Sequence, residues 1–411
     1  MQILHINHPS DIKQTMLNIG VDPYGIKIML PKAITYLVRM NSVSNIAANI
    51  LKQEMLSLGG DVAVSRGALT GKTKKTDCLL MGNLSQLNRL NLKLNKQPFG
   101  LSKIADDLVN TLNNYQRDKF TLKLGKGKLN LGKRAHIMGI VNLTPDSFSA
   151  DGLYSSIAKQ GLSPLELKLT SLKGTVPERA VDFVEKMIKD GADIIDIGGE
   201  SSRPNARPVS IKEELARTIS VIKLLSKRIK APISIDTYKP EVAEQALDNG
   251  ASLVNDISGL RDKGMAGLIA KYKAGVVIMH MRGAPSNMQK NIRYNSLIED
   301  IIQYLAMAID EAEGAGIDKE KIIIDPGIGF GKTVKHNLEI LNRLQEFKVL
   351  GKPILVGSSR KSFIGKILNA LPKARIFGTV SSCVLAVKNG AKLVRVHDVL
   401  EVKQALKIIE A

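Results

Sequence analysis

At eight places in the second two-thirds of the chain, an apolar, β-branched run ends in a cluster of residues that bind anions or polar rings. The clusters contain Asn142, Glu200-Ser201-Ser202-Arg203, Asp236, Asn255-Asp256, His280, Asp325, Arg360-Lys361, and Arg395 with His397. Carboxylates and amides pair with the donor and acceptor edges of a heterocycle. Arginine, lysine and histidine bind phosphate oxygens. These residue types predict a site for a ligand with a polar ring and an anionic group.

The apolar runs are strand-like and are separated by helix-length segments. They are His136–Thr144, Asp193–Ser201, Ile233–Thr237, Leu253–Ser258, Val276–Met281, Ile322–Phe330, Ile354–Ser359 and Leu393–Asp398. Eight strand–helix units predict a closed parallel (β/α)₈ barrel. Barrels of this kind carry their active site at the carboxyl ends of the strands, where the polar clusters fall.

Three of these polar residues suit a ring such as an aminopyrimidinone. Asp236, Asn255 and Asp325 end the third, fourth and sixth predicted strands. Strands of a barrel interior are mostly apolar, so such groups must be paired or used. The alternative is a structural polar layer that fills the end of the barrel. His280 is as compatible with a core role as with a catalytic one.

A cationic set follows the last two strands, where barrels usually bind phosphate. Lys361 lies between strand seven and a helix, and Arg395 and His397 share one face of strand eight by its period of two. After strand two, the two glycines, two hydroxyls and one arginine of Gly198–Arg203 also suit an anion. The segment after strand one, which starts at Asn142, offers hard oxygen ligands for Mg²⁺; an ordinary turn is the alternative.

The chain of 411 residues exceeds the roughly 250 of one barrel, so we expect a second domain at the N-terminus. We place this α/β domain at residues 1–120, a connecting hairpin at 121–134 and the barrel at 135–411. Its expected elements are strands at Ile26–Leu30, Val62–Val64 and Cys78–Met81, and helices at Asn41–Leu58, with Ser42 or Ser44 as its cap, and Gly100–Tyr115. The connection Tyr154–Glu178 is unusually long and is either an inserted lid or a surface insertion.

The net charge is +20, and residues 1–134 contribute 20 Lys+Arg against 8 Asp+Glu. This charge is compatible with nucleic-acid binding, with attraction of an anionic substrate, or with a solvated lysine-rich surface. The absence of tryptophan and of a recognisable nucleic-acid motif favours the last. No run approaches the ~18 apolar residues of a membrane span. Cys78 and Cys383 lie in no metal-type spacing, which predicts a reduced, cytoplasmic chain.

Five segments resemble dihydropteroate synthase, in order and at suitable spacing over about residues 135–411. They are Met138–Ser149, Asp196–Pro204, Asp325–Lys332, Ser359–Ser362 and Arg395–Asp398. The resemblance implies an enzyme of folate biosynthesis, a transferase that joins 6-hydroxymethyl-7,8-dihydropterin diphosphate to 4-aminobenzoate. It also implies a homodimer that binds these small molecules and neither nucleic acid nor membrane.

The resemblance also implies a role for each matching position. Asp236, Asn255, Asp325 and Lys361 would hold the pterin, and Asn142 would bind Mg²⁺ together with the diphosphate. Ser202, Arg203, Arg395 and His397 would contact the diphosphate or order the segments around it. Pro204, Phe330 and Ser362 would lie near the aminobenzoate. Among these, Asp236, Lys361, Arg395 and His397 are the expected catalytic residues.

Three positions depart from the family pattern. Ser202 replaces a threonine and keeps its hydroxyl, Asp151 is shifted by one place, and Tyr238 replaces a small residue and is positioned to meet the pterin or the inserted segment. A pterin-dependent methyltransferase that serves a corrinoid protein is the alternative enzyme, but it needs no diphosphate pocket. A basic nucleic-acid-binding protein built on a barrel is the alternative outside enzymes.

Overall fold

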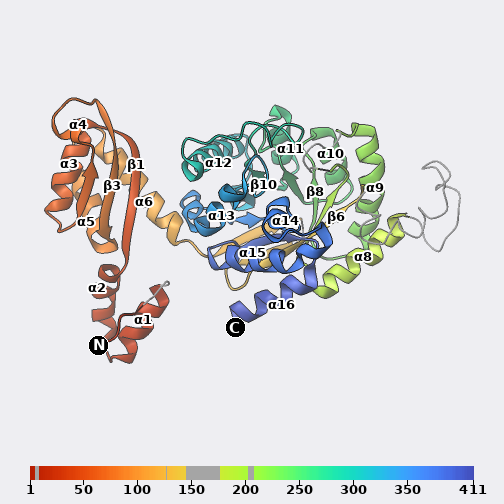
Figure 1. Cartoon of the computed structure of the whole chain (residues 1–411), viewed down its shortest axis with the longest axis horizontal. Helices are drawn as coiled ribbons and strands as arrows, with labels where there is room; N and C mark the ends of the chain where they lie inside the picture. Colours follow the sequence, from red (N-terminus) through yellow and green to blue (C-terminus); the bar gives the residue numbers. More distant parts are fainter. Residues whose placement is uncertain (5–8, 126, 145–175, 202–207) are drawn as a thin grey trace. The chain divides into compact units, whose positions relative to one another are not determined.

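The computed structural model describes residues 1–4, 9–125, 127–144, 176–201 and 208–411. The chain divides into two compact units, Met1–Asn113 and Asn114–Ala411 (Figure 1). Each unit has its own hydrophobic core. They are therefore described separately.

The first unit is a three-stranded antiparallel sheet with helices. Its strands are β1 (Thr35–Ser44), β2 (Asp61–Val64) and β3 (Lys75–Asn83), in the order β1-β3-β2. Its helices are α1 (Pro9–Asn18), α2 (Pro23–Ala33), α3 (Asn45–Leu56), α4 (Arg66–Leu69), α5 (Leu84–Leu94) and α6 (Leu101–Gln116). Leu51, Met55 and Leu80 meet Leu87 and Leu90 in its core, so α3 and α5 cover the sheet.

The strand expected at Ile26–Leu30 is wrong, because these residues belong to helix α2. Asp22 caps this helix by accepting hydrogen bonds from the amides of Tyr24 and Gly25, and Pro23 occupies the first turn. This start signal outweighs the strand-like alternation of the residues that follow.

Other expected elements of this unit keep their type but change in extent. The helix predicted from Asn41 begins at Asn45, because residues 41–44 extend β1, and Ser44 is its cap. The strands at 62–64 and 78–81 and the helix at 100–115 are confirmed within β2, β3 and α6. Strand β1 and helix α5 were not predicted.

The second unit is the (β/α)₈ barrel, and each of the eight predicted runs matches one parallel strand, although β10 begins one residue before its run. The strands are β6 (His136–Asn142), β7 (Ile194–Gly198), β8 (Ile233–Asp236), β9 (Leu253–Asp256), β10 (Gly275–Met279), β11 (Ile322–Asp325), β12 (Leu355–Val356) and β13 (Leu393–Val396). They pair in the order β11-β10-β9-β8-β7-β6-β13-β12. A bridge between Ile324 and Ile354 joins the two ends and closes the barrel.

Helices surround these strands (Figure 1). They are α8 (Val176–Asp190), α9 (Ile211–Arg228), α10 (Pro240–Asp248), α11 (Lys263–Lys271), α12 (Leu297–Gly314), α13 (Val334–Asn342), α14 (Ser362–Leu368), α15 (Ile376–Lys388) and α16 (Val399–Glu410). Within the described residues, 3₁₀ helices also lie at Lys319–Lys321, Leu344–Leu350 and Pro372–Arg375. Outward-facing strand residues such as Ile235 and Val254 pack with the helices in the main core.

A hairpin of β4 (Phe120–Leu124) and β5 (Gly127–Leu131) fills the amino-terminal end of the barrel. Its buried residues share one cluster with the inward-facing residues Met138, Ile194, Leu253, Val277, Ile323, Leu355 and Leu393. Because side chains alternate along a strand, the residues two places further on also face inward, and on four of these strands they are polar: Asp196, Asn255, Asp325 and Arg395. The barrel therefore has an apolar floor beneath a charged layer.

In the described part of the chain, no single helix is long and apolar enough to cross a membrane. One bent pair, Ser362–Leu368 with Pro372–Lys388, meets the requirement by length and composition alone. Both cysteines, Cys78 and Cys383, are free and buried.

Candidate active site

Arg395 joins two carboxylates at the carboxyl end of the barrel. Its Nε donates to Asp196 Oδ2 at 2.6 Å, and its Nη2 donates to Asp236 Oδ2 at 2.5 Å. Asp196 Oδ2 also accepts from Asn255 Nδ2 at 3.1 Å. Asp236 and Asn255 are directly paired across β8 and β9. One guanidinium thus fixes the predicted residues of strands three, four and eight in a single network.

This network sits where water cannot screen it, and the pKa values of its members shift accordingly. Burial raises the pKa of Asp236 to about 7, against the opposing effect of Arg395 and with a further increase from Asp196. Burial also acts to lower the pKa of Arg395, but Asp196 and Asp236 outweigh it, so the net shift is upward. Arg395 therefore stays charged, whereas Asp236 changes its protonation near neutral pH.

Lys361 precedes helix α14 and reaches over the loop that follows β11. Its Nζ donates to the carbonyl of Ile328 at 2.9 Å and lies 3.8 Å from the centroid of the Phe330 ring. Gly329 has a φ of 84°, and a Cβ there would lie 2.9 Å from Lys361 Cδ. Burial lowers the pKa of Lys361 to about 7, although Asp325 favours its charged form.

Asp325 lies at the end of β11 and is influenced by the charges of Lys361 and of a second lysine. Its Oδ1 accepts the amide of Gly327 at 2.7 Å, yet burial raises its pKa. The second lysine, Lys332, is fully enclosed and donates to the carbonyls of Phe330 and His280 at 3.0 and 3.3 Å. The charges of Lys361, Lys332 and Arg395 thus all favour the ionised form of Asp325.

His280 has a supporting position. Its Nδ1 lies 2.9 Å from Lys332 Nζ, which can only donate, so Nδ1 accepts. Burial and the charge of Lys332 lower the pKa of His280 to about 2. A Cβ on Gly327 would lie 1.9 Å from the carbonyl oxygen of His280, so the loop after β11 packs directly on this residue. These contacts give His280 a core role.

His397 links the first and last strands of the barrel. Its Nδ1 is 3.0 Å from Ser359 Oγ, and its Nε2 is 3.5 Å from Asn142 Nδ2. Since an amide nitrogen only donates, the second contact favours the tautomer with hydrogen on Nδ1. Arg360, in contrast, forms an ion pair with Asp398. Its Nε donates to Oδ2 at 3.0 Å and its Nη2 donates to Oδ1 at 2.5 Å.

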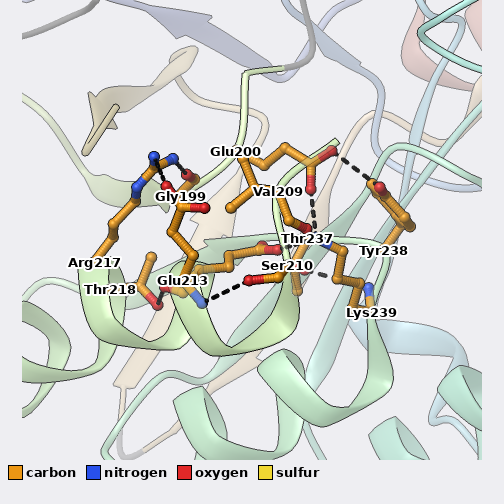
Figure 2. Close-up of polar contacts among 11 residues, drawn as sticks. Gly199, Glu200, Val209, Ser210, Glu213, Arg217, Thr218, Thr237, Tyr238 and Lys239 are labelled. Carbon is orange, nitrogen blue, oxygen red and sulfur yellow. Dashed lines mark hydrogen bonds and ion pairs between the residues drawn. The ribbon is translucent and has the colours of Figure 1, made fainter. Parts of the chain in front are cut away.

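A second ionic cluster is centred on Lys239 (Figure 2). Lys239 Nζ contacts Glu200 Oε2 at 2.5 Å and Glu214 Oε2 at 2.6 Å. The Tyr238 hydroxyl donates to Glu200 Oε1 at 3.0 Å. A hollow next to this cluster is lined by Glu200, Ser201, Glu214, Asp236, Thr237, Tyr238, Ile257 and Pro285.

The structure gathers the predicted residues of six strands at one end of the barrel. Phe330 is buried beneath Lys361, whereas Ser362, the first residue of α14, is exposed. Ser202, Arg203, Pro204, Asp151 and residues 154–175 of the long connection lie outside the described residues.

Sequence reasoning gave no role to Asp196, Lys239 or Lys332. The alternation of side chains along a strand could have identified Asp196. It lies two residues after Ile194 and so faces the barrel interior, as Ile194 does. Lys239 and Lys332 follow their strands in loops, where no periodicity predicts the direction of a side chain.

Comparisons with known proteins agree with this geometry. A family described as pterin binding enzyme matches residues 169–397. A dihydropteroate synthase of Clostridium beijerinckii is 45% identical over 291 residues, which are 70% of this chain and 98% of that protein. The chain belongs to the dihydropteroate synthase family of pterin-binding enzymes. The crystal structure of the Yersinia pestis dihydropteroate synthase, in complex with a sulfonamide drug, shares 38% identity and a TM-score of 0.64, covering 71% of this chain and 98% of that one.

The first unit also has a counterpart among these relatives. A probable bifunctional folylpolyglutamate synthase/dihydropteroate synthase of Halobacterium salinarum is 38% identical over 401 residues. That match covers 98% of this chain and 46% of the relative. It therefore includes the first unit, which the match to the Clostridium beijerinckii enzyme, at 70% of this chain, does not span in full.

The two groups with a pKa of about 7 predict the pH dependence of dihydropteroate synthase activity. Asp236 loses its charge as the pH falls below about 7, and Lys361 loses its charge as the pH rises above about 7. We expect kcat/KM for the pterin substrate, which reports groups of the free enzyme, to be highest near neutral pH. Lys361→Arg should lower the rate but abolish the alkaline decline, since arginine keeps its charge. An unchanged alkaline decline in this variant would show that another group causes it.

Proposed function

We propose that this chain condenses 6-hydroxymethyl-7,8-dihydropterin diphosphate with 4-aminobenzoate, and releases 7,8-dihydropteroate and diphosphate, in folate biosynthesis. The observation that carries the proposal is the buried layer in which Arg395 binds Asp196 and Asp236 while Lys361 faces Asp325. This layer offers acceptors for a nitrogen-rich ring directly beside cations for its diphosphate.

The pterin ring is bound by the carboxylates and the amide of the layer. Asp236 and Asp325 accept its N–H groups, and Asn255 both donates and accepts. Asn255 is held for this by Asp196, at 3.1 Å. Lys361, whose ammonium group lies over the Phe330 ring, donates a hydrogen bond to the pterin ring. Because these groups are buried, a ring that did not match them would leave polar groups without hydrogen-bond partners, which costs free energy. The site therefore selects a ring with the matching donors and acceptors.

The diphosphate is bound by Arg395 and His397 with Ser202 and Arg203. Mg²⁺ takes hard oxygen ligands and usually keeps waters and substrate phosphates in its shell. Asn142 fits such an ion, because its Nδ2 faces His397 and leaves the amide oxygen for the cation. When bound, Mg²⁺ neutralises charge on the leaving diphosphate.

The reaction breaks the bond between the pterin methylene carbon and the bridging diphosphate oxygen, which leaves with the electron pair. Asp236 stabilises the positive charge that develops on the pterin. The amine of 4-aminobenzoate, held near Pro204, Phe330 and Ser362, forms the new C–N bond and then loses one proton. Exclusion of water from this site keeps hydrolysis from competing.

A direct assay tests the function. The full-length protein is incubated with the pterin diphosphate, Mg²⁺ and 4-aminobenzoate, and dihydropteroate and diphosphate are measured. We expect equal amounts of both products, and loss of both when EDTA removes the cation. Diphosphate release without dihydropteroate would contradict the condensation, and transfer of a methyl group to a corrinoid protein would favour the alternative enzyme.

Two substitutions test the roles of the buried charges. Asp236→Asn and Lys361→Ala should each lower kcat at least about 100-fold, the scale of losing one preorganised charge in a dry site. The exposed Lys366 on helix α14 supplies the control, and Lys366→Ala should keep the wild-type rate. Near-normal turnover in either site variant would refute its assigned role.

Exposed apolar side chains on α14, the following 3₁₀ turn and α15 support a homodimer. Ile367, Leu368, Leu371 and Phe377 are among the most exposed large apolar residues of the barrel unit. A cluster of this kind usually marks a contact surface. The buried free thiols Cys78 and Cys383 support a reducing compartment, and we infer the cytoplasm.

Phe377→Glu should convert the dimer to a monomer, because it places a charge in the apolar contact. Sedimentation velocity should then report a mass near 44.7 kDa instead of twice this value. Leu400→Glu, at another exposed leucine, is the matched control and should remain dimeric. Wild-type protein that sediments as a monomer at micromolar concentration would contradict the homodimer.

A further inference from the structure

Lys239 has an ammonium group that meets three oxygens from three parts of the barrel (Figure 2). Besides Glu200 and Glu214, Nζ donates to the carbonyl of Val209 at 2.6 Å. The side chain is only 14% exposed, and Glu214 is 1% exposed. With three N–H donors, a lysine at three such oxygens has used its full bonding capacity.

We propose that Lys239 is a positioning residue for the reaction, which ties the two ends of the β7–α9 connection together and shields Asp236 from the neighbouring carboxylate of Glu214. The proposal deepens the function proposed above and rests on it. Lys239 touches no reacting atom in this account. It acts through Glu200 and Val209 on one side and through Glu214 on the other.

Glu200 lies two residues after the end of β7, and Val209 comes just before Ser210, the cap of α9. One ammonium therefore holds the start and the end of the connection at a single point, and that point is three residues beyond Asp236. Arg217 adds a second tie, donating to the carbonyl of Gly199 at 2.6 Å.

This tie also fixes the wall of the hollow beside Asp236. Ser201, next to Glu200, lines the same hollow as Asp236 and Tyr238. The Tyr238 hydroxyl binds the other oxygen of Glu200, so both oxygens of this carboxylate are held. Loss of the ammonium would leave Glu200 with only one of these two hydrogen bonds, the one from Tyr238.

The charged groups that face Asp236 are Arg395 from β13, Asp196 from β7, Glu214 from α9 and Lys361 from the start of α14. Glu214 acts to raise the pKa of Asp236, and Lys239 binds this same carboxylate. Burial acts to lower the pKa of Lys239, but its bonds to Glu200 and Glu214 outweigh this and the net shift is upward. The ammonium therefore stays charged and is paired directly with the carboxylate that raises the pKa of Asp236.

The test compares Lys239→Met, Glu214→Gln and the double variant with wild type. Each is titrated by calorimetry with 6-hydroxymethyl-7,8-dihydropterin, a probe without the ionising diphosphate, over a range of pH. Lys239→Met should move the acid midpoint of binding upward by about half a pH unit or more, since a nearby charge is removed. Glu214→Gln should move it downward, and the double variant should return close to wild type.

The second readout is local and needs no catalysis. Hydrogen exchange should become faster in peptides that contain Gly199–Ser201 and Val209–Ser210 when Lys239 is replaced by methionine. In the condensation assay the same variant should lose about 10- to 100-fold in kcat/KM for 4-aminobenzoate, the scale of a small misplacement of groups around the reacting centre.

Lys352→Met is the matched control. Lys352 is also buried and binds a carboxylate, Glu313 Oε1 at 2.6 Å, and the carbonyl of Lys319 at 3.0 Å, but it lies at the opposite end of the barrel. Lys352→Met should lower the melting temperature by about as much as Lys239→Met does. It should change neither the pH midpoint of pterin binding nor the hydrogen exchange of the peptides that contain Gly199–Ser201 and Val209–Ser210.

The outcomes separate the two proposals. A wild-type protein that makes no dihydropteroate overturns the proposed function, whatever the variants do. A folded Lys239→Met protein with wild-type midpoint and wild-type exchange at 199–210 overturns the role of Lys239. The double variant guards against misfolding, because it removes one of the buried carboxylates that the single change leaves without a partner.

Discussion

The site depends on one constraint: charged side chains are held out of water above an apolar floor. Arg395 can stand between Asp196 and Asp236 only because their opposite charges offset the cost of burial. The floor, made by seven strand residues and the β4–β5 hairpin, closes the barrel from below. A ligand that pairs with these charged groups can therefore enter only from the carboxyl ends of the strands.

The same constraint explains why the site is poised near neutral pH. Burial disfavours both charged forms, so it raises the pKa of Asp236 and lowers that of Lys361, and the two values meet at about 7. Lys332 shows the same downward shift for the same reason, and its carbonyl and imidazole partners hold the loop after β11 in place. An anionic substrate with a polar ring fits such a site, because its ring N–H groups can donate to the carboxylates and its anionic group can bind the cations.

Around this layer, a second set of contacts fixes the elements that carry it. Lys239 joins the end of β7, the start of α9 and the end of β8, and Ser359 joins the end of β12 to His397. Gly327 and Gly329 let the loop after β11 approach His280 and Lys361 at distances that a side chain would forbid. Rigid supports of this kind are what a site needs if its groups are to act without rearrangement.

The sequence by itself determined the barrel, its eight strands and the end at which Asp236, Asn255, Asp325, Lys361, Arg395 and His397 meet. It could do so because a period of two with a polar residue at each strand end is a local signal. It misassigned Ile26–Leu30, where a short alternating run competed with a helix cap, and it missed the roles of Asp196, Lys239 and Lys332. Only the tertiary structure decided these, because an ion pair between residues far apart in sequence, such as Arg395 with Asp196, leaves no local pattern. It is created by burial, which exists only once the strands have closed around it.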